Sequence, residues 1–446
     1  MRDIPSFIDE GNCLALDKES VNADIRSYVT AQLSKRRDFL NKNLSQDLLE
    51  KIRTKVGDRA DGIWASCQLD DLARCRHQAA IEKALASLPK NLEETYRRMI
   101  QRIPVEFEKD AIQLLQFLVH LKRPLKLAEA KEVIATQVEY EPRGFDVKRR
   151  LFCETDITDY CPSLVTVVHT TDSELHLAHF SVKEYLLGEN QFRVATASIS
   201  ITKTCLTYLT DIKDSCQEIK REFPLARYAA EVWADNAASA QASENIVPVI
   251  VSFMENEVTF QRWTRLYQAD RYWVNDPGTP RGSRLYYACF VGLIAPVRYL
   301  IEKGADVNAQ GGYYGNALQA ASSRGHQEIV KLLLDKGADV NAQGGAYDNA
   351  LYAASWGGHQ EIVKLLLDKG ADVNAQGGKY GNALQAASSG GHQEIVKLLL
   401  DKGADFNAHG SSQEGVSQES AGAGKRYRET PLCGSMISSH RGFHGR

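Results

Sequence analysis

Apolar residues recur with a period of 33 positions in the C-terminal part of the chain. The string Gly-His-Gln-Glu-Ile-Val-Lys-Leu-Leu-Leu begins at residues 325, 358 and 391, and Gly-Ala-Asp begins at residues 304, 337, 370 and 403. A fixed period of this length indicates a solenoid of stacked helical units. One unit is too small to bury its own apolar face, so each unit must pack against its neighbours.

The second unit shows how the pattern should fold. Asn316 can cap a short helix, because its side-chain oxygen can accept the unpaired N–H groups of the first turn. A turn at Gly325 leads into a second helix over 328–336, in which isoleucine, valine and leucine share one face. Gly337 can end that helix in the left-handed conformation. Residues 339–345 then form an extended finger with a glycine turn.

The spacing of apolar residues also predicts helices on the N-terminal side of the repeats. Asn22 and Ser45 are suited to cap the first two. Asn91, followed three residues later by Glu94, predicts a capping box for a helix over 92–103. Further helices are expected over 63–72, 81–88 and 109–121.

The middle of the chain has a different pattern. A β-branched run over 163–168 and an alternating run over 174–179 predict a β-hairpin. Ser181 with Glu184 should cap the helix that follows. Helices followed by a hairpin indicate a winged-helix domain. The helical pattern then resumes, and Pro277-Gly-Thr-Pro280 marks the expected hinge into the repeats.

The repeat units resemble ankyrin repeats in their period, their Gly-His turn and their Gly-Ala-Asp-Val-Asn string. Four units fit, at 282–314, 315–347, 348–380 and 381–409. The Thr-Pro-Leu-His of the ankyrin family is replaced by Asn-Ala-Leu followed by Gln or Tyr, and the asparagine can still cap the helix. The first unit has Gly292-Leu293 in place of Gly-His.

The second, third and fourth units are nearly identical, so the positions at which they differ are informative. The differences fall at the finger tips and in the first helices, which in ankyrin arrays resemble a concave binding surface. Neutral drift at exposed positions is the alternative interpretation. Because aromatic residues dominate interface hot spots, we expect Trp356 and Tyr352 to anchor a protein partner. The predicted protein-binding residues are Tyr313, Gln319, Arg324, Ala346, Tyr352, Trp356, Lys379 and Gln385.

A second resemblance covers roughly residues 1–275. Five segments are similar to fungal NACHT–ankyrin proteins, which are signalling NTPases related to animal NOD-like receptors: 68–75, 88–96, 122–125, 178–186 and 223–230. The resemblance implies the end of a nucleotide-binding module, then a winged helix, then a helical linker, with Arg2 as a sensor arginine. The family's phosphate-binding loop, Gly-x-x-x-x-Gly-Lys-Ser/Thr, does not occur in the sequence. We therefore expect no enzymatic activity and no bound cofactor.

Composition and charge exclude several other kinds of site. The net charge is −3, and 148–150 is the only basic cluster near the predicted winged helix, so neither nucleic acid nor membrane is an expected partner. No apolar run approaches the ~18 residues that span a bilayer. The nine cysteines contain no Cys-x-x-Cys pair, which favours reduced thiols in a cytoplasmic protein. His176 and His179 should point to opposite faces of a strand, so we expect no metal.

The sequence thus predicts a mainly α protein, with a helical and winged-helix region followed by an ankyrin-repeat α-solenoid. The expected domains are a helical remnant (1–75), a winged helix (76–195), a helical connector (196–280), four ankyrin repeats (281–410) and a disordered tail (411–446). The expected function is non-enzymatic protein–protein interaction through the concave surface, as a signalling adaptor or the sensing half of a fungal NOD-like receptor. The alternatives are a C-terminal fragment of a signalling NTPase and, more distantly, winged-helix DNA binding. The sequence does not indicate an oligomeric state.

Overall fold

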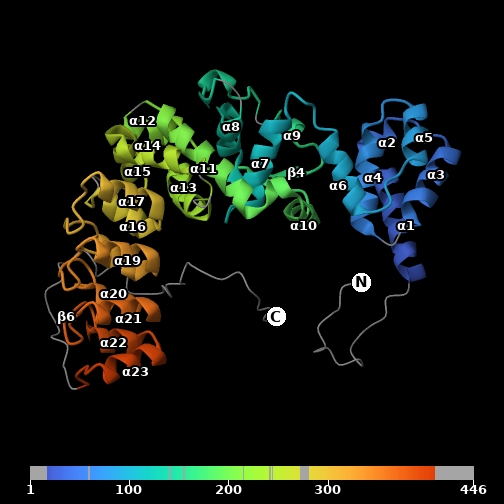
Figure 1. Ribbon diagram of the computed structural model, residues 1–446. Coiled ribbons are helices and arrows are strands. Elements are labelled where there is room, and N and C mark those ends of the chain that lie inside the picture. The colour runs from blue at the N-terminus through green and yellow to red at the C-terminus, as the bar shows by residue number, and fades with distance from the viewer. Residues whose placement is uncertain are drawn as a thin grey trace, which may run out of the picture.

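The computed structural model describes residues 18–58, 61–139, 142–153, 156–213, 215–240, 243, 245–271 and 281–406. These residues are mainly helical and form an arc, with a helical bundle at one end and the repeat array at the other (Figure 1). The predicted fold class is confirmed. The predictions for Arg2, the proline hinge and the tail concern residues outside the described ranges.

Five helices form the N-terminal bundle around a core of their own. They are α1 (Lys18–Lys35), α2 (Arg37–Leu40), α3 (Gln46–Gly57), α4 (Gly62–Arg74) and α5 (Gln78–Ala86). Trp64 and Ile52 lie in this core, and Ile81 and Leu85 of α5 belong to it as well. The bundle therefore extends about ten residues beyond the boundary expected at residue 75.

The predicted helix caps agree in part with the structure. Ser45 caps α3, because its hydroxyl accepts from the Leu48 N–H at 3.3 Å. Asn22 lies inside α1, so that predicted cap is wrong. Asn91 caps α6 (Leu92–Gln101) by accepting from the Glu94 N–H at 2.8 Å, but the Glu94 carboxylate binds the Lys90 N–H, so only this half of the predicted capping box is confirmed.

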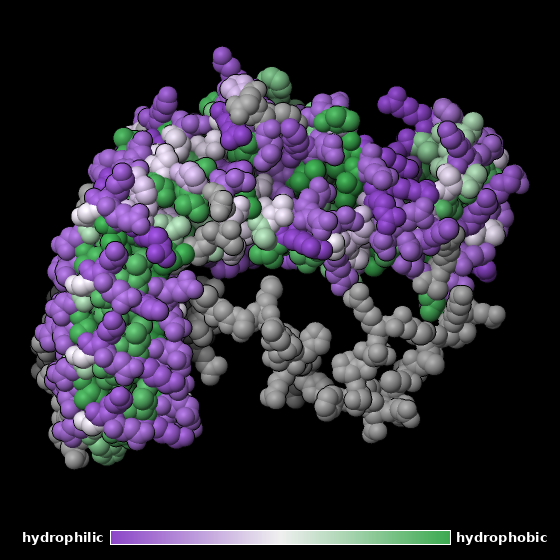
Figure 2. Space-filling view, in the orientation of Figure 1, coloured by the Kyte–Doolittle hydropathy of each residue, from purple (hydrophilic) through white to green (hydrophobic). Residues whose placement is uncertain are grey.

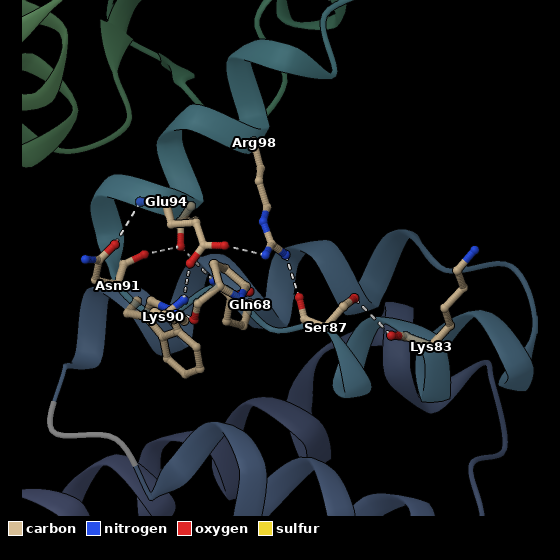
Figure 3. A network of polar contacts seen from close by, with 10 residues as sticks. Gln68, Lys83, Ser87, Lys90, Asn91, Glu94 and Arg98 are labelled. Carbon is tan, nitrogen blue, oxygen red and sulfur yellow. Dashed lines mark hydrogen bonds and ion pairs between the residues drawn. The ribbon is translucent and has the colours of Figure 1, made fainter.

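Helix α6 joins the N-terminal bundle to the rest of the chain (Figure 3). The Glu94 carboxylate accepts from the Lys90 N–H at 2.7 Å, and it also pairs with Arg98. The Arg98 guanidinium in turn donates to the carbonyl oxygen of Ser87, at the end of α5. Gln68 of α4 donates to the Thr95 hydroxyl at 3.3 Å. These bonds attach the start of α6 to α4 and to the end of α5.

The middle of the chain has the helices and the small antiparallel sheet expected of a winged helix. Its elements after α6 are α7 (Glu108–His120), β1 (Leu125–Lys126), α8 (Leu127–Ala135), β2 (Thr136–Gln137), β3 (Gly144–Phe145), η2 (Val147–Arg149), α9 (Ile157–Tyr160), β4 (Val165–Val168), β5 (Glu174–Leu177), α10 (Phe180–Gly188) and η4 (Asn190–Phe192). The predicted hairpin is present as β4 and β5, and β1 adds a third strand in the order β1-β5-β4. Leu125 and Leu175 face each other in this sheet and are buried.

The cap of α10 differs from the prediction. His179 occupies the N-cap position, and its Nδ1 accepts from the Ser181 N–H at 3.2 Å. The Ser181 hydroxyl instead bonds the Tyr96 hydroxyl of α6 at 2.7 Å. The serine therefore links two helices rather than starting one.

A helical connector follows the winged helix. It consists of α11 (Val194–Asp211), α12 (Cys216–Glu222), α13 (Ala226–Ala240), α14 (Val247–Glu255), α15 (Glu257–Leu266) and η5 (Ala269–Arg271). Glu132 of α8 is buried against it and accepts from Arg150 at 2.7 Å and from the Tyr208 hydroxyl of α11 at 2.8 Å. A buried carboxylate is stable only when it is paired in this way, so Glu132 ties the winged helix to the connector.

Aromatic rings join the connector to the first repeat unit. Trp263 of α15 lies between Trp233 of α13 and Tyr287 of the first unit, with centroid distances of 4.8 and 5.7 Å. The buried Asp270 carboxylate accepts from the Tyr286 hydroxyl at 2.7 Å and from the Tyr313 N–H at 2.8 Å. One continuous apolar core therefore runs from the winged helix through the connector into the array.

The array is a stack of helix pairs. The pairs are α16 (Arg284–Val291) with α17 (Ile294–Glu302), α18 (Ala317–Arg324) with α19 (Gln327–Asp335), α20 (Ala350–Trp356) with α21 (Gln360–Asp368), and α22 (Ala383–Ser389) with α23 (Gln393–Asp401). The short strands β6 (Gln376–Gly377) and β7 (Gly381–Asn382) pair in the finger between α21 and α22. Apolar residues gather in a column down the stack, with polar residues on both sides (Figure 2). Asn316 caps α18 as predicted, because it accepts from the Gln319 N–H at 2.9 Å.

Histidines connect each unit to the one before it. Nε2 of His326, His359 and His392 donates to the carbonyl oxygens of Phe290, Ser323 and Trp356, at 3.1, 3.2 and 3.1 Å. These carbonyls lie at the end of the preceding unit's first helix, where helical partners run out. In the first unit Leu293 takes the histidine position and is fully buried. The connector, rather than another unit, precedes it, so an apolar side chain fits there.

Asparagines connect neighbouring fingers. Asn308 donates to the Gly337 carbonyl oxygen at 3.1 Å and accepts from the Asp339 N–H at 2.8 Å. Asn341 and Asn374 make the same pair of bonds one and two units later. The Gly-Ala-Asp-Val-Asn string therefore serves the stacking of units, since its asparagine holds the next copy of its own Gly-Ala-Asp.

Alanine substitution at two matched glycines should separate stacking from backbone strain. Gly358 and Gly391 both have φ near +75°, but a Cβ at Gly358 would lie 2.5 Å from the His392 ring, whereas a Cβ at Gly391 meets nothing within 4 Å. Both substitutions should cost about 1–2 kcal/mol for the left-handed backbone. Gly358→Ala should cost a further ~1 kcal/mol, because His392 must leave its carbonyl partner. Urea unfolding measures both, and equal losses would contradict the histidine contact.

Acid should weaken the array through the same histidines. Burial lowers the pKa of His326 to about 4 and also lowers the pKa of His359. The unfolded chain, with histidine pKa values near ~6.5, therefore binds more protons than the folded one below that pH. The stabilising contribution is complete above about pH 6.5 and is lost as the pH falls toward 4. Unfolding midpoints of the wild type and of His326→Gln/His359→Gln test this, and an equal pH dependence of the two proteins would refute it.

Candidate functional site

The predicted binding residues occupy two levels of the array. Tyr313, Ala346 and Lys379 are equivalent finger positions, and Gln319, Tyr352 and Gln385 are equivalent positions in the first helices, while Arg324 and Trp356 end α18 and α20. Tyr313 and Lys379 are exposed, and Arg324, Ala346, Trp356 and Gln385 are partly exposed. Gln319 and Tyr352 are 0% and 1% exposed.

Gln319 and Tyr352 hold the fingers instead of facing a partner. The Gln319 amide donates to the carbonyl oxygens of Ala342 and Asp348 at 3.0 and 2.9 Å. The Tyr352 hydroxyl accepts from the Tyr380 N–H at 3.2 Å. The expectation that Tyr352 is an exposed anchor is therefore wrong. The residue at this position differs among the units because two side chains can bind the following finger. Tyrosine accepts through its hydroxyl group, and glutamine donates through its side-chain amide.

Two aromatic pairs lie where the first helices meet the fingers. Phe290 stacks on Tyr314 with a centroid distance of 5.4 Å and an interplanar angle of 24°. Trp356 stacks on Tyr380 at 5.0 Å and 26°. The two pairs are equivalent and lie two units apart in the array. Tyr347, the tyrosine of the intervening unit, packs edge-on against Tyr314 at 5.1 Å.

The three finger tyrosines, Tyr314, Tyr347 and Tyr380, were missed by the sequence comparison. They are the same residue in the three copies that have them, so a comparison of differences among copies does not detect them. The signal that could have found them is a tyrosine that recurs every 33 positions, at 24 positions after Phe290 and again at 24 positions after Trp356. Together with Tyr313 and Trp356 they form the surface that we call the aromatic face.

The cations at the aromatic face lie on rings. The Arg324 guanidinium carbon is 5.0 Å from the Phe290 ring centroid, and the Lys379 Nζ is 5.4 Å from that of Tyr380. Contacts of this kind bring roughly 0.5–1 kcal/mol at exposed positions. The carboxylate of Asp348, which no other unit has at this position, accepts from the Gly378 N–H at 2.6 Å. Aromatic side chains are enriched at protein interfaces.

A cavity lies between the N-terminal bundle and the winged helix. It has a volume of about 610 Å³ and is lined by residues that include Tyr28, Cys67, Asp70, Tyr96 and His179. Burial raises the pKa of the Cys67 thiol to about 12, so this cysteine is not an activated nucleophile. Among the described residues there is no group of three histidine, cysteine or acidic side chains that could hold a metal.

The basic cluster over 148–150 is partly engaged within the winged helix. Arg150 pairs with Glu132 at 2.7 Å, and Arg149 pairs with Asp110 at 3.3 Å. Both carboxylates are buried. Two of the three basic side chains of the cluster therefore pair with buried carboxylates of the domain.

Comparison with known families bears on two parts of the chain. Residues 237–344 and 344–410 match the family model for ankyrin repeats in three copies, and residues 96–198 match that for the winged helix domain of GPI inositol-deacylase. The chain contains ankyrin repeats. It also contains a winged helix of this type, whose match begins in α6, after the N-terminal bundle.

One relative is the azaphilone pigments biosynthesis cluster protein L of Monascus ruber. It is 36% identical to the chain over 288 residues, which cover 57% of this chain and 61% of the relative. The chain thus spans less than two thirds of the length of this relative. Within the described residues, no helix has both the length and the apolar content needed to cross a membrane.

The role of Tyr352 can be tested by removing its hydroxyl group. Tyr352→Phe should lower the stability of the array by about 1 kcal/mol, because the Tyr380 N–H loses its acceptor. The ring remains, so binding of a protein partner should not change. Urea unfolding and a binding titration measure the two effects. Unchanged stability with weakened binding would show that Tyr352 contacts the partner after all.

Proposed function

We propose that this chain is a non-enzymatic interaction component that binds a protein partner through the aromatic face of its ankyrin repeats. The observation that carries the proposal is the pair Trp356–Tyr380, two partly exposed rings stacked at 5.0 Å. Tryptophan and tyrosine are the residues most enriched at binding hot spots. Because winged helix, connector and array share one core, the aromatic face is held in a fixed orientation to the rest of the chain.

We further propose a role in signalling, as an adaptor or as the sensing half of a fungal NOD-like receptor acting in the cytoplasm. The support is the resemblance of segments such as 178–186 to NACHT–ankyrin proteins and the order of winged helix, connector and repeats. The named relative belongs to an azaphilone pigment biosynthesis cluster, so proteins of such a cluster are the first candidates for a partner.

A second candidate is the C-terminal portion of a signalling NTPase, with a nucleotide-binding module encoded upstream. The N-terminal bundle and its cavity against the winged helix favour it, because they provide a surface on which such a module could close. The mass of the native protein separates the candidates. A band near 49.6 kDa supports a free-standing adaptor, and a much larger band supports the NTPase.

Alanine substitutions on two sides of the array test the interaction proposal. Tyr313→Ala/Tyr347→Ala/Trp356→Ala removes rings of the aromatic face. The control, Lys331→Ala/Lys364→Ala/Lys397→Ala, changes one equivalent position in the second helix of each of three units. Proteins labelled by proximity to the full chain in its own cells should be lost with the first variant, at least tenfold, and retained with the control. Equal labelling by both variants, with both folded, would overturn the proposal.

A further inference from the structure

The two aromatic pairs differ in what covers them. Phe290 is 4% exposed, because Tyr314 stacks on it and the Arg324 guanidinium of the next unit lies 5.0 Å from its centroid. Trp356 has the equivalent tyrosine, Tyr380, but remains partly exposed. The position equivalent to Arg324, two units later, is a glycine, Gly390.

Gly390 has no side chain that could lie on Trp356 as the Arg324 guanidinium lies on Phe290. Its φ is −79°, so the backbone does not require glycine there. A Cβ at this position would lie 2.6 Å from the His392 ring, so even a small side chain would displace that ring. The larger and more strongly cation-binding ring, tryptophan, thus has no cation from the next unit where phenylalanine has one.

The electrostatic setting at Trp356 also favours a cation. Trp356 is the last residue of α20, as Arg324 is the last residue of α18, and the C-terminal end of a helix carries partial negative charge. The Asp348 carboxylate accepts from the Gly378 N–H and so adds a negative charge to the finger that carries Tyr380. Lys379 is the opposing charge at this pair, and it is an exposed side chain that lies on the Tyr380 ring.

We propose that the Trp356–Tyr380 pair is a binding site for an arginine side chain of the protein partner. The guanidinium would lie on Trp356 as Arg324 lies on Phe290, so the array itself shows the kind of group that fits. Arginine rather than lysine is the expected residue, because a planar guanidinium stacks on an aromatic face. This inference rests on the proposed function and specifies one contact of that interface.

Two substitutions at Trp356 keep the array intact, because its own units contain them. Trp356→Ser installs the residue found at the equivalent positions 323 and 389, and Trp356→Phe installs the residue at 290. The probe is a random library of 12-residue peptides, selected for binding to the full chain. Selected peptides should contain arginine, and replacing it with alanine should weaken binding about tenfold. Replacing it with lysine should have a smaller effect.

The variants then locate the arginine contact. In Trp356→Ser the difference between the arginine and alanine peptides should vanish, whereas Trp356→Phe should keep most of it. Gly390→Arg should compete with the peptide and reduce its binding about tenfold. Because His392 must move in Gly390→Arg, the melting temperature of this variant is measured first. If Gly390→Arg is unfolded, Trp356→Ser alone tests whether the peptide arginine contacts Trp356. Lys379→Ala should strengthen binding of the arginine peptide.

The outcomes separate this inference from the proposed function. Peptides that depend on Tyr347 but show no need for arginine, or that bind Trp356→Ser as tightly as the wild type, overturn the arginine site and leave the aromatic face as an interface. A library that yields no binder dependent on any residue of the aromatic face counts against both. An arginine effect that is lost in Trp356→Ser and kept in Trp356→Phe supports both.

Discussion

Stacking between neighbouring units is the interaction on which the array depends. None of the units encloses its own core, and the leucine-rich second helices are covered only when a further unit is present. Each interface between two units combines apolar packing with two sets of hydrogen bonds. A histidine binds the carbonyl at the end of the preceding unit's first helix, and an asparagine binds the following finger. The buried apolar residues, the histidine and the asparagine of the repeated strings are therefore committed to stacking.

The same need for cover explains how the array begins. Its first unit replaces the histidine with buried Leu293 and packs through Tyr287 on Trp263 of the connector. Asp270 of the connector holds the first finger, as Tyr352 and Gln319 hold the later ones. The connector therefore acts as the N-terminal capping unit of the solenoid. Through Glu132, which accepts from the Tyr208 hydroxyl of α11, the connector is in turn fixed to the winged helix.

Much of the fold follows from local sequence rules. The period places the helices, and the caps at Ser45, Asn91 and Asn316 are correct because an asparagine or serine oxygen needs only its own next turn. The prediction for Ser181 is wrong for a non-local reason, since Tyr96, 85 residues away, binds its hydroxyl. Sequence alone does not show such a partner.

The aromatic face could be predicted only in part. Differences among copies pointed to Tyr313 and Trp356 of this face, but they equally pointed to Tyr352 and Gln319, whose side chains are buried beneath the fingers. The unvarying tyrosines, which supply half of each stacked pair, were not detected by that comparison.

The most direct test of partner binding at the aromatic face is hydrogen–deuterium exchange of the full chain with and without the partner found by proximity labelling. Our account predicts new protection in the fingers and in α20 and α22, with α19, α21 and α23 unchanged. Protection confined to those second helices, or to the cavity beside the winged helix, would contradict it.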